Sequence, residues 1–335
     1  MKLALTFYSV LKMPIKDIIT CSIASEKAGF EYISAAESFY RDAFVLSSAI
    51  ASKTNRIKFG SSIIPIHTRT PFQIAMASTT LNEISNGRLG YIGLGIGYRS
   101  RIEKYFGVKI EKSSSKMKEY VEIIRGLLSG TDFSYHGKFF DFTGFPKLVS
   151  RPLKIPILFG SSGDKMIRLA GRVGDGLVLN SIGTREYYKH VLSVLHDARR
   201  DASRKSTKYE IASSVIFSVS DKHEEAVNAA RHDVLFYVLY PELDPVIAKT
   251  PYVETVKEIR KTYAQGKTNE SLLLISDKMV EDLSVCGTAK ECRKKMRKLF
   301  DFGITLPIIR VSVQPFKENR RKQVFLEAIN SLKRI

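Results

Sequence analysis

The chain alternates short apolar segments with amphipathic segments about eight times, and this alternation limits the folds that it can adopt. The apolar segments have the length of strands and lie at 3–7, 31–36, 56–65, 88–97, 155–160, 176–180, 210–219 and 305–312. The segments between them have helical spacing and include 14–29, 42–54, 69–87, 116–129, 164–173, 185–202 and 288–302, with a last helix over 319–333. Continuous apolar strands that alternate with helices predict a parallel sheet buried on both faces. We therefore expect one domain over 1–335 with the α/β fold of a (β/α)8 TIM barrel, whose active site lies at the carboxyl ends of the strands.

Local signals mark the ends of several predicted helices. Gly29 is a suitable C-cap for the first helix, because glycine adopts the left-handed conformation at little cost. Thr70 is a suitable N-cap, and Pro71 follows at the first helical position, where its missing N–H is harmless. In the same helix Ile74, Ala77, Leu81 and Ile84 are expected to form the packed stripe, with Gly87 as the stop.

Two regions interrupt the alternation. Residues 133–145 have the pattern of a hairpin, within an insertion of about 130–150 before the fifth strand. Residues 220–287, between the seventh and eighth strands, are too long for a single crossover, and two or three helices are expected there. Insertions on this face commonly shape substrate pockets, and a purely structural cap is the alternative.

The chain has a strong excess of positive charge. Lysine and arginine number 53 against 34 aspartate and glutamate, which gives a formal net charge of +19. Such a balance attracts anions, including nucleic acid and phosphorylated or carboxylated small molecules. The basic runs 199–205, 293–298 and 317–322 are expected to be solvated helix faces, since no aromatic residues interleave with them. A non-catalytic nucleic-acid-associated protein is one alternative, and it predicts affinity that falls steeply with salt.

Other residue types exclude several classes of protein. Cys21, Cys286 and Cys292 form no CxxC pair, so we expect reduced structural thiols in a cytoplasmic protein. The six histidines include no HExxH motif, and no bound metal is expected. No apolar run approaches the length of a membrane span, and the start of the chain resembles a first buried strand rather than a signal peptide. The expected partner is a small-molecule substrate, with neither nucleic acid nor membrane.

The stretch GYIGLGIGYRSR, residues 90–101, carries glycines at 93, 95 and 97. A dinucleotide fingerprint would need its third glycine at 98 or 100, which are Tyr98 and Ser100. Glycines at the end of a barrel strand have another use, because a flat ring can approach the backbone where no Cβ intervenes. Arg99, directly after them, could hold an anion.

The motifs around these glycines resemble the bacterial luciferase-like flavin and deazaflavin oxidoreductases. Residues 36–107 carry the pattern R-T-P…A…T-L…S-N-G-R…G-L-G-I-G, and the block IPILFGSSGDKMIRLAGRVGDGLVLNS at 155–181 resembles the fifth and sixth strands of the family. The likeness covers about residues 1–315. AESFYRDA, residues 36–43, is most similar to the branch that uses coenzyme F420, which includes the methylenetetrahydromethanopterin reductases.

The resemblance implies a barrel, usually dimeric, with the cofactor ring at the carboxyl ends of the strands. It implies a non-proline cis peptide between Ser62 and Ile63, for which a plain β-bulge at Gly60 is the alternative. It assigns catalysis to Glu37 and Ser38. The residues that it implies for cofactor binding are Thr6, Ser61, Ser62, Ile63, Gly95, Ile96, Gly97, Tyr98, Arg99, Ser161, Ser162 and Gly163. The last three also suit a phosphate at a helix N-terminus, with ordinary N-capping as the alternative.

The sequence departs from the family pattern at several positions. Many deazaflavin enzymes of the family have an Asp-His pair where this chain has Glu37 and Ser38, and a serine cannot act as a base at neutral pH. The methylenetetrahydromethanopterin reductases have acidic residues at the positions of Thr6 and Tyr98. The likeness therefore supports the cofactor class better than a pterin substrate, and Glu37 could equally be a structural ion-pair partner.

These observations predict a coenzyme F420-dependent oxidoreductase that transfers a hydride between the deazaflavin and a small organic substrate. The cofactor would carry out the chemistry, while the protein positions it and excludes water. The positive charge of the chain suits the polyglutamate tail of F420. An FMN-dependent luciferase-like monooxygenase on the same barrel is the alternative, with Arg99 and Ser161 to Gly163 at its single phosphate.

Overall fold

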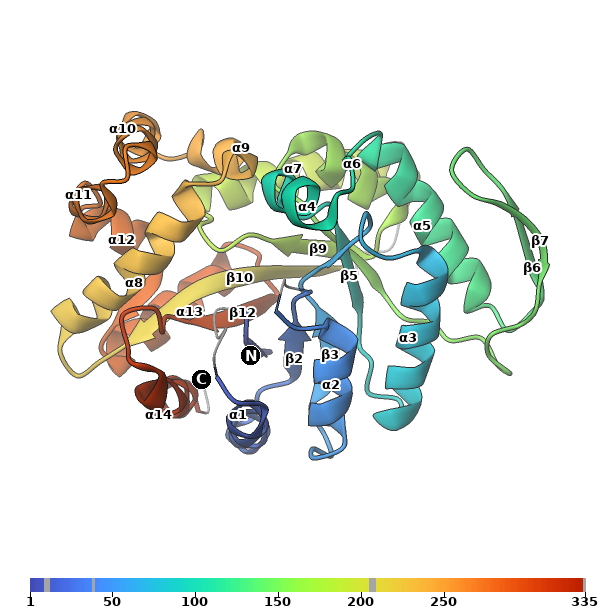
Figure 1. Ribbon diagram of the computed structural model, residues 1–335, viewed down its shortest axis with the longest axis horizontal. Coiled ribbons are helices and arrows are strands. Elements are labelled where there is room, and N and C mark those ends of the chain that lie inside the picture. The colour runs from blue at the N-terminus through green and yellow to red at the C-terminus, as the bar shows by residue number, and fades with distance from the viewer. Residues whose placement is uncertain (9–12, 38–39, 205–208, 334–335) are drawn as a thin grey trace. The chain divides into compact units, whose positions relative to one another are not determined.

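The computed structural model describes residues 1–8, 13–37, 40–204 and 209–333, and it consists of parallel strands that alternate with helices (Figure 1). Among these residues ten strands form one sheet, in which β11 pairs with β10 beside the path β3-β2-β1-β12-β10-β9-β8-β5-β4. Every pairing recorded along this path is parallel, so the predicted parallel α/β arrangement is confirmed.

The chain divides into two compact units. Unit 1 contains Met1–Ile33, Leu179–Ser193 and Ile211–Ile335, and unit 2 contains Ser34–Val178 and Val194–Glu210. The strand β2 (Tyr32–Ala35) and the helix α7 (Arg185–Asp201) have residues in both units, and so do β9 and β10, through the last residue of β9 and the first residue of β10.

Unit 1 is built on the parallel pairing of β1 with β12. Ala4 pairs with Ile308 and Thr6 with Arg310, while β10 lies on the other side of β12. The strands of unit 1 are β1 (Ala4–Thr6), β10 (Glu210–Val219), β11 (Val285–Gly287) and β12 (Leu306–Val311). Its helices are α1 (Ile15–Ala28), α8 (His223–Val238), η1 (Pro241–Leu243), α9 (Asp244–Ile247), α10 (Val253–Ala264), α11 (Thr268–Leu273), α12 (Asp277–Leu283), α13 (Ala289–Asp301) and α14 (Glu318–Ser331).

Unit 2 holds the other strands, with β5 paired to β4 and β8. Leu94 pairs with Ile64 on one side and Phe159 on the other, and all three side chains are fully buried. The strands of unit 2 are β3 (Lys58–Ser61), β4 (Ile64–Pro65), β5 (Ile92–Gly95), β6 (Phe133–His136), β7 (Asp141–Phe145) and β8 (Ile157–Gly160), followed by β9 (Gly176–Leu179). Its helices are α2 (Ala43–Ala51), α3 (Pro71–Ile84), α4 (Arg99–Phe106), α5 (Ser113–Leu127) and α6 (Asp164–Val173).

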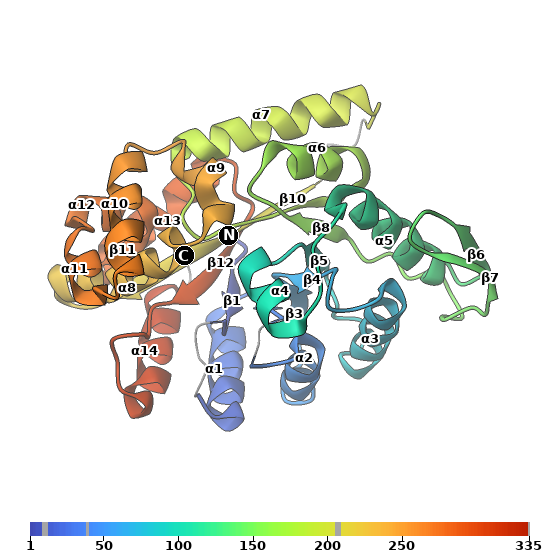
Figure 2. The same cartoon turned by 45° about the horizontal axis from the view of Figure 1, so that its top comes forward.

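The predicted hairpin insertion is confirmed as the antiparallel pair β6 and β7, which both ribbon views show beside α5 (Figure 2). Its turn is fixed by the buried carboxylate of Glu119 on α5. This carboxylate accepts hydrogen bonds from the backbone N–H groups of Lys138, Phe139 and Phe140, at 2.8, 3.0 and 3.2 Å. Aromatic residues of the hairpin pack beneath this turn against Ile123 and Leu127.

Several predicted elements need correction. The strand predicted over 56–65 is two strands, β3 and β4, and the helix α4 was not predicted. The region 220–287 holds more helices than expected, and it ends in the strand β11. In α3, Thr70 and Pro71 take their predicted capping positions, but Ile84 is exposed and Ala77 is half-buried. The buried face of α3 uses Ala75 and Ser78 instead, because the helix turns by about 100° per residue and the narrow stripe drifts off the core.

Candidate active site

The interruption between β3 and β4 in unit 2 is held by specific hydrogen bonds to the strands on either side. The peptide bond between Ser62 and Ile63 is cis, as the family resemblance implied. The Ser61 hydroxyl donates to the Gly93 carbonyl at 3.1 Å and accepts from the Gly93 N–H at 2.8 Å. A side chain thus replaces the ladder bonds that the interrupted strand cannot make to β5. On the other side, the Ser62 N–H donates to the Ala35 carbonyl at 2.9 Å, so the interruption stays joined to β2.

The side chain of Ile63 lies over two glycines. A Cβ on Gly95 would lie 2.6 Å from Ile63 Cδ1, and a Cβ on Gly160 would lie 2.8 Å from Ile63 Cγ2. Gly95 and Gly160 therefore make room for the isoleucine, and the expectation that Gly95 lets a flat ring approach stays a prediction. Ile63 itself is half-buried. Part of the apolar surface of Ile63 is therefore accessible at this rim.

Glu37, at the end of β2, is held by two partners. One carboxylate oxygen accepts from Arg69 Nε at 2.8 Å, and the other accepts from the Ala43 N–H at 2.8 Å, at the start of α2. Arg69 also pairs with Asp42, whose side chain caps α2. The two acidic partners hold the pKa of Arg69 above its usual value despite burial. These contacts support the ion-pair interpretation of Glu37, and its catalytic assignment remains a prediction.

The end of β5 leads directly into α4. Ile96, Gly97 and Tyr98 are half-buried, and Tyr98 is the N-cap of α4. Gly97 has a φ of +77°, and a Cβ there would lie 3.2 Å from Ile102 Cγ1. A side chain at this position would strain the backbone whether or not a ring binds nearby. Arg99 begins α4, and its guanidinium donates to Glu103 at 2.6 Å.

The end of β8 forms a turn of small residues before α6. The Ser161 hydroxyl donates to the Gly163 carbonyl at 3.1 Å, and Gly163 is the N-cap of α6. Because Gly163 has no side chain, no side-chain oxygen from the N-cap closes the first turn of this helix. The amino end of α6 therefore presents the positive end of a helix dipole beside Ser162, as an anion site requires.

Unit 2 thus contains most of the residues predicted for the site. Ser61 to Ile63, Gly95 to Arg99 and Ser161 to Gly163 all follow the carboxyl ends of its strands. Thr6 is buried at the end of β1 in unit 1. Ser38 lies outside the described residues. The binding roles of these residues remain predictions.

Sequence reasoning missed Arg69 and His67, both in the loop between β4 and α3. Arg69 is the ion-pair partner of Glu37. The imidazole of His67 is buried, and burial together with the positive charges of Lys116 and Arg99 lowers its pKa to about 4. The signal was present, because IHTRT directly follows a strand that the sequence analysis already placed at the active face. The missing information was which carboxylate and which helix these side chains would meet.

The described residues were also compared with what a metal site and a membrane-spanning helix require. Within the described ranges, no group of three or more His, Cys, Asp and Glu side chains is arranged to hold a metal ion. The described helices also include none with the length and apolar character needed to cross a membrane.

Comparison with protein families identifies the group to which this chain belongs. The family model described as luciferase-like monooxygenase matches residues 5–306. The chain belongs to the luciferase-like monooxygenase family. The oxidoreductase class expected from the sequence is thereby confirmed.

Within the family the chain is 27% identical to a 5,10-methylenetetrahydromethanopterin reductase of Methanolobus tindarius, over 94% of this chain and 96% of the relative. It is 29% identical to the Archaeoglobus fulgidus protein of the same name, with 92% and 93% covered.

A solved structure extends the likeness to the fold. The coenzyme F420-dependent tetrahydromethanopterin reductase from Methanopyrus kandleri superposes with a TM-score of 0.83, at 22% identity and with 99% of each chain covered. The predicted luciferase-like barrel fold is therefore confirmed. In this fold the carboxyl ends of the strands carry the active site, which is where Ile63, Gly97 and Ser161 lie in unit 2.

Proposed function

We propose that this member of the luciferase-like family is a coenzyme F420-dependent oxidoreductase similar to the methylenetetrahydromethanopterin reductases. The observation that carries the proposal is the half-buried Ile63 side chain, which packs over Gly95 and Gly160 at the rim where such a ring would lie. The relatives named above support it, because two carry the name of that reductase and the third is described as F420-dependent.

The residues present fit a flat ring with an anionic side chain. Ile63 offers an apolar face to the ring. Gly95 and Gly160 let the Ile63 side chain pack directly against the backbone of β5 and β8, because a side chain larger than hydrogen at either position would displace it. Ser161, Ser162 and the amino end of α6 would hold a phosphate, with Arg99 as a second positive group. When bound, the deazaflavin supplies hydride transfer at its C5 position. The chain's own residues hold it in one orientation and exclude water from its face.

Glu37 has a positioning role in this proposal. Its two oxygens join the end of β2 to Arg69 and to the first turn of α2, so the carboxylate fixes the rim next to the cis peptide. The substrate would be a small organic hydride donor or acceptor. A pterin is less well supported, because Thr6 and Tyr98 stand where the reductases have acidic residues.

Cofactor titration tests the proposal. We expect the purified protein to bind F420 at micromolar concentration, seen as a change in deazaflavin fluorescence, and to bind FMN more weakly. Ile63→Ala should weaken F420 binding about tenfold, because it removes apolar contact worth about 1–2 kcal/mol. Ile84→Ala, the same substitution at an exposed position of α3, is the matched control and should leave affinity unchanged.

The alternative function has its own expected result. An FMN-dependent monooxygenase is favoured by the description of the family whose model matches. Micromolar binding of FMN with no binding of F420 would reverse the ranking. Equal F420 affinity in Ile63→Ala and the wild type would show that the ring does not lie on Ile63.

A further inference from the structure

A group of polar side chains lies inside unit 1, at the carboxyl ends of β1 and β12. Thr6, the last residue of β1, pairs with Arg310 in the parallel ladder, so both side chains leave the sheet on the same face. Phe7 stacks on Phe325 of α14, with 5.2 Å between the ring centres, so Thr6, directly before it, faces away from α14. This face meets α8, whose Asp233 pairs with Arg310 at 3.0 Å. In this fold the carboxyl ends of the strands carry the active site.

Three oxygen atoms around Arg310 have no hydrogen-bond partner among the described residues. They are Thr6 Oγ1, Ser312 Oγ and Asp233 Oδ2, from residues that are 2%, 1% and 0% exposed. Ser312 follows Arg310 by two residues, and its N–H continues the ladder to β10, so its side chain lies on the same face as Arg310. Buried polar atoms nearly always have a partner, because burial without one costs free energy. These atoms therefore indicate a place for water or for a polar group of a ligand.

Gln314 shows which kind of group the carboxylate of Asp233 accepts. Gln314 is exposed, and its Nε2 atom lies 3.4 Å from Asp233 Oδ1. This distance is at the limit of a hydrogen bond, so the contact is weak and is easily replaced. The amide at this place is uncharged and donates an N–H. The carboxylate is thus one exposed side chain away from solvent, and a ligand that displaces Gln314 would reach it.

The charges of this group are balanced before any ligand binds. The guanidinium of Arg310 and the carboxylate of Asp233 neutralise each other, and aromatic rings lie around the guanidinium. A ligand with a charge of either sign would leave one buried charge without compensation, which is costly. An uncharged hydroxyl or amide avoids this cost. It can also donate to Asp233 Oδ2 and accept from the hydroxyl of Thr6 or Ser312.

Aromatic rings beside the ion pair leave apolar surface accessible. Tyr8 and Phe236 lie 5.5 and 5.2 Å from the guanidinium of Arg310. Phe236 also meets Tyr8 and Tyr240 edge to face, with ring centres 6.5 and 5.2 Å apart. These three aromatic residues are half-buried, whereas Arg310 is 1% exposed. Such a surface suits an apolar or planar body that carries the polar group at one end.

We propose that this group in unit 1 selects an uncharged substrate. Asp233, Thr6 and Ser312 bind its hydroxyl or amide group, and the half-buried aromatic rings pack against its apolar body. Arg310 holds the carboxylate of Asp233 in place and is a positioning residue. The inference deepens the proposed function, on which the identification of the ligand as the substrate rests. It assigns Thr6 to the substrate, where the family resemblance implied a contact with the cofactor.

Four probes that share one benzene ring test the site by NMR titration at pH 7, on the protein alone and again with F420 added. Benzyl alcohol donates and accepts, benzyl methyl ether only accepts, benzoate is an anion and benzylamine is a cation. We expect benzyl alcohol to bind at millimolar concentration. Each of the other three should bind at least about fivefold more weakly, because a hydrogen bond is lost or a charge is left uncompensated. Equal binding of all four, or no binding of benzyl alcohol in either condition, would overturn the proposal.

Removal of single hydroxyl groups tests the contacts to the ligand. Thr6→Val and Ser312→Ala should each raise the Kd of benzyl alcohol about fivefold, as expected for one hydrogen bond, and leave the Kd of F420 unchanged. Thr20→Val removes a hydroxyl on α1 that donates to the Lys16 carbonyl, and this matched control should change neither affinity. Loss of F420 affinity in Thr6→Val with unchanged binding of benzyl alcohol would return Thr6 to the cofactor and contradict the assignment.

The ion pair is tested with a double variant, because loss of Asp233 alone leaves the charge of Arg310 uncompensated. Asp233→Leu with Arg310→Met removes both charges together, and urea unfolding shows whether this variant is folded. It should bind benzyl alcohol at least about tenfold more weakly, as expected for one charge-assisted hydrogen bond. It should bind benzyl methyl ether as the wild type does. Unchanged binding of benzyl alcohol would show that the carboxylate does not contact the ligand.

The displacement of Gln314 has its own test. Gln314→Ala should bind benzyl alcohol at least as tightly as the wild type, because the amide that competes for Asp233 is gone. Gln323→Ala, at an exposed position of α14 that pairs with Glu327, is the matched control and should leave this affinity unchanged. Weaker binding in Gln314→Ala alone would contradict the displacement.

Failure of the proposed function gives a different pattern. If F420 does not bind, the cofactor assignment is wrong, and binding of benzyl alcohol that depends on Asp233 and Thr6 still upholds a site for an uncharged ligand. If F420 binds but the protein does not distinguish the four probes, the cofactor assignment stands and the selection of an uncharged substrate is overturned.

Discussion

Arg310 and Asp233 form an ion pair inside unit 1, where 1% and 0% of their side chains are exposed. The guanidinium donates to Asp233 at 3.0 Å and lies beside the rings of Tyr8, Phe236 and Tyr237, at 5.5, 5.2 and 4.6 Å. These aromatic rings exclude water but stabilise a cation through their faces. The carboxylate is the group that neutralises the charge, so the pair depends on both members being present.

Removal of one member should therefore be costly. We expect Asp233→Ala to lower the free energy of unfolding by about 3–5 kcal/mol, because it leaves a buried charge without compensation. The double variant Asp233→Leu with Arg310→Met should lose less than Asp233→Ala alone. Urea unfolding followed by circular dichroism measures both, and Glu254→Ala, which breaks an exposed pair with Lys257, is the control with little effect. A loss of under 1 kcal/mol in Asp233→Ala would contradict this account.

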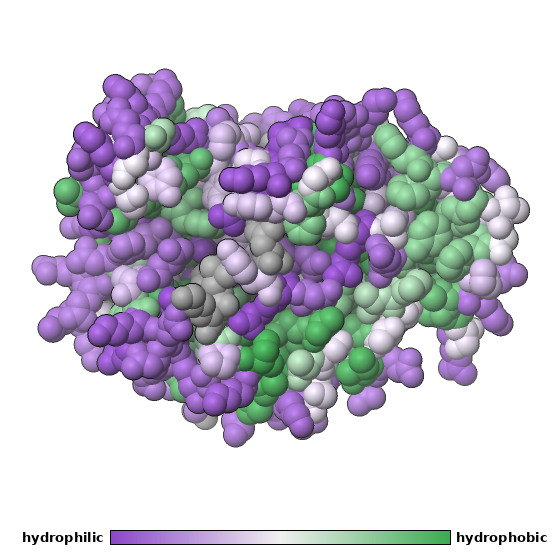
Figure 3. Space-filling view, in the orientation of Figure 1, coloured by the Kyte–Doolittle hydropathy of each residue, from purple (hydrophilic) through white to green (hydrophobic). Residues whose placement is uncertain are grey.

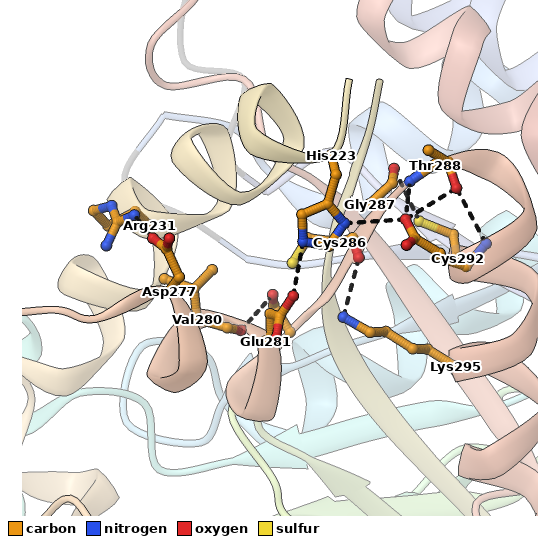
Figure 4. A network of polar contacts seen from close by, with 12 residues as sticks. His223, Arg231, Asp277, Val280, Glu281, Cys286, Gly287, Thr288, Cys292 and Lys295 are labelled. Atoms are coloured by element: carbon orange, nitrogen blue, oxygen red, sulfur yellow. Dashed lines mark hydrogen bonds and ion pairs between the residues drawn. The ribbon is translucent and has the colours of Figure 1, made fainter. Parts of the chain in front are cut away.

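At the scale of elements, a histidine joins three parts of unit 1. His223, at the start of α8, points toward Glu281 (Figure 4) and also pairs with a second glutamate, Glu291. The distances are 2.8 Å from Nε2 to Glu281 of α12 and 3.1 Å from Nδ1 to Glu291 of α13. Glu291 also completes the capping box of α13 with Thr288. On the same side Lys295 donates to the Cys286 carbonyl rather than to either glutamate.

This arrangement predicts a direction of pH dependence. Hydrogen bonds to Glu291 and Glu281 raise the pKa of His223 above its usual value. The stability that the charged imidazole contributes is therefore fully present below the unfolded pKa near 6.5 and is lost as pH rises through the raised folded pKa. The hydrogen bond from His223 is the largest of several causes that lower the pKa of Glu291 to about 2. The stability contributed by this carboxylate is therefore fully present above its unfolded pKa near 4.5 and is lost as pH falls through the folded value.

Comparison of His223→Gln with the wild type across pH measures the effect. The difference between their urea midpoints should be larger at pH 6 than at pH 9, because glutamine does not titrate. Glu281→Gln, which leaves Glu291 in place, should reduce the pH dependence without removing it. A difference that is constant with pH would show that the charge on His223 does not contribute to stability.

The elements also show what sequence could and could not predict. Most strand and helix positions followed from hydrophobic period and capping, since these are local properties; α6 and β10 have the bounds that were predicted. The division of 56–65 into β3 and β4 depends on Ser61 bonding to Gly93, a contact 32 residues away that no local pattern contains. Gly95 was correctly selected as a close-approach position, but the group that approaches is Ile63. Which group approaches Gly95 could be learned only from the packed structure, because it depends on contacts between distant parts of the chain.

At the scale of the whole molecule, the charge of the chain limits how copies can associate. With a formal net charge of +19, two copies carry like charge, which opposes their association. The helix α2 has no charged residue, and Figure 3 shows hydrophobic residues gathered in its region. Val45 on α2 is 69% exposed, while Met76 and Ile84 on the neighbouring α3 are 47% and 44% exposed. An apolar contact between copies could form on this surface, because α2 contributes no charge to it.

We expect a homodimer that uses this α2 and α3 surface. Val45→Lys should shift the protein to monomer in analytical ultracentrifugation, because it places a desolvated positive charge in the contact of an already basic chain. The thermal midpoint of the monomer should show that it remains folded. Leu273→Lys, at a position 84% exposed on α11, adds the same charge elsewhere and should leave the dimer intact. Dissociation by both substitutions would point to net charge alone, and dissociation by neither would place the contact on another face.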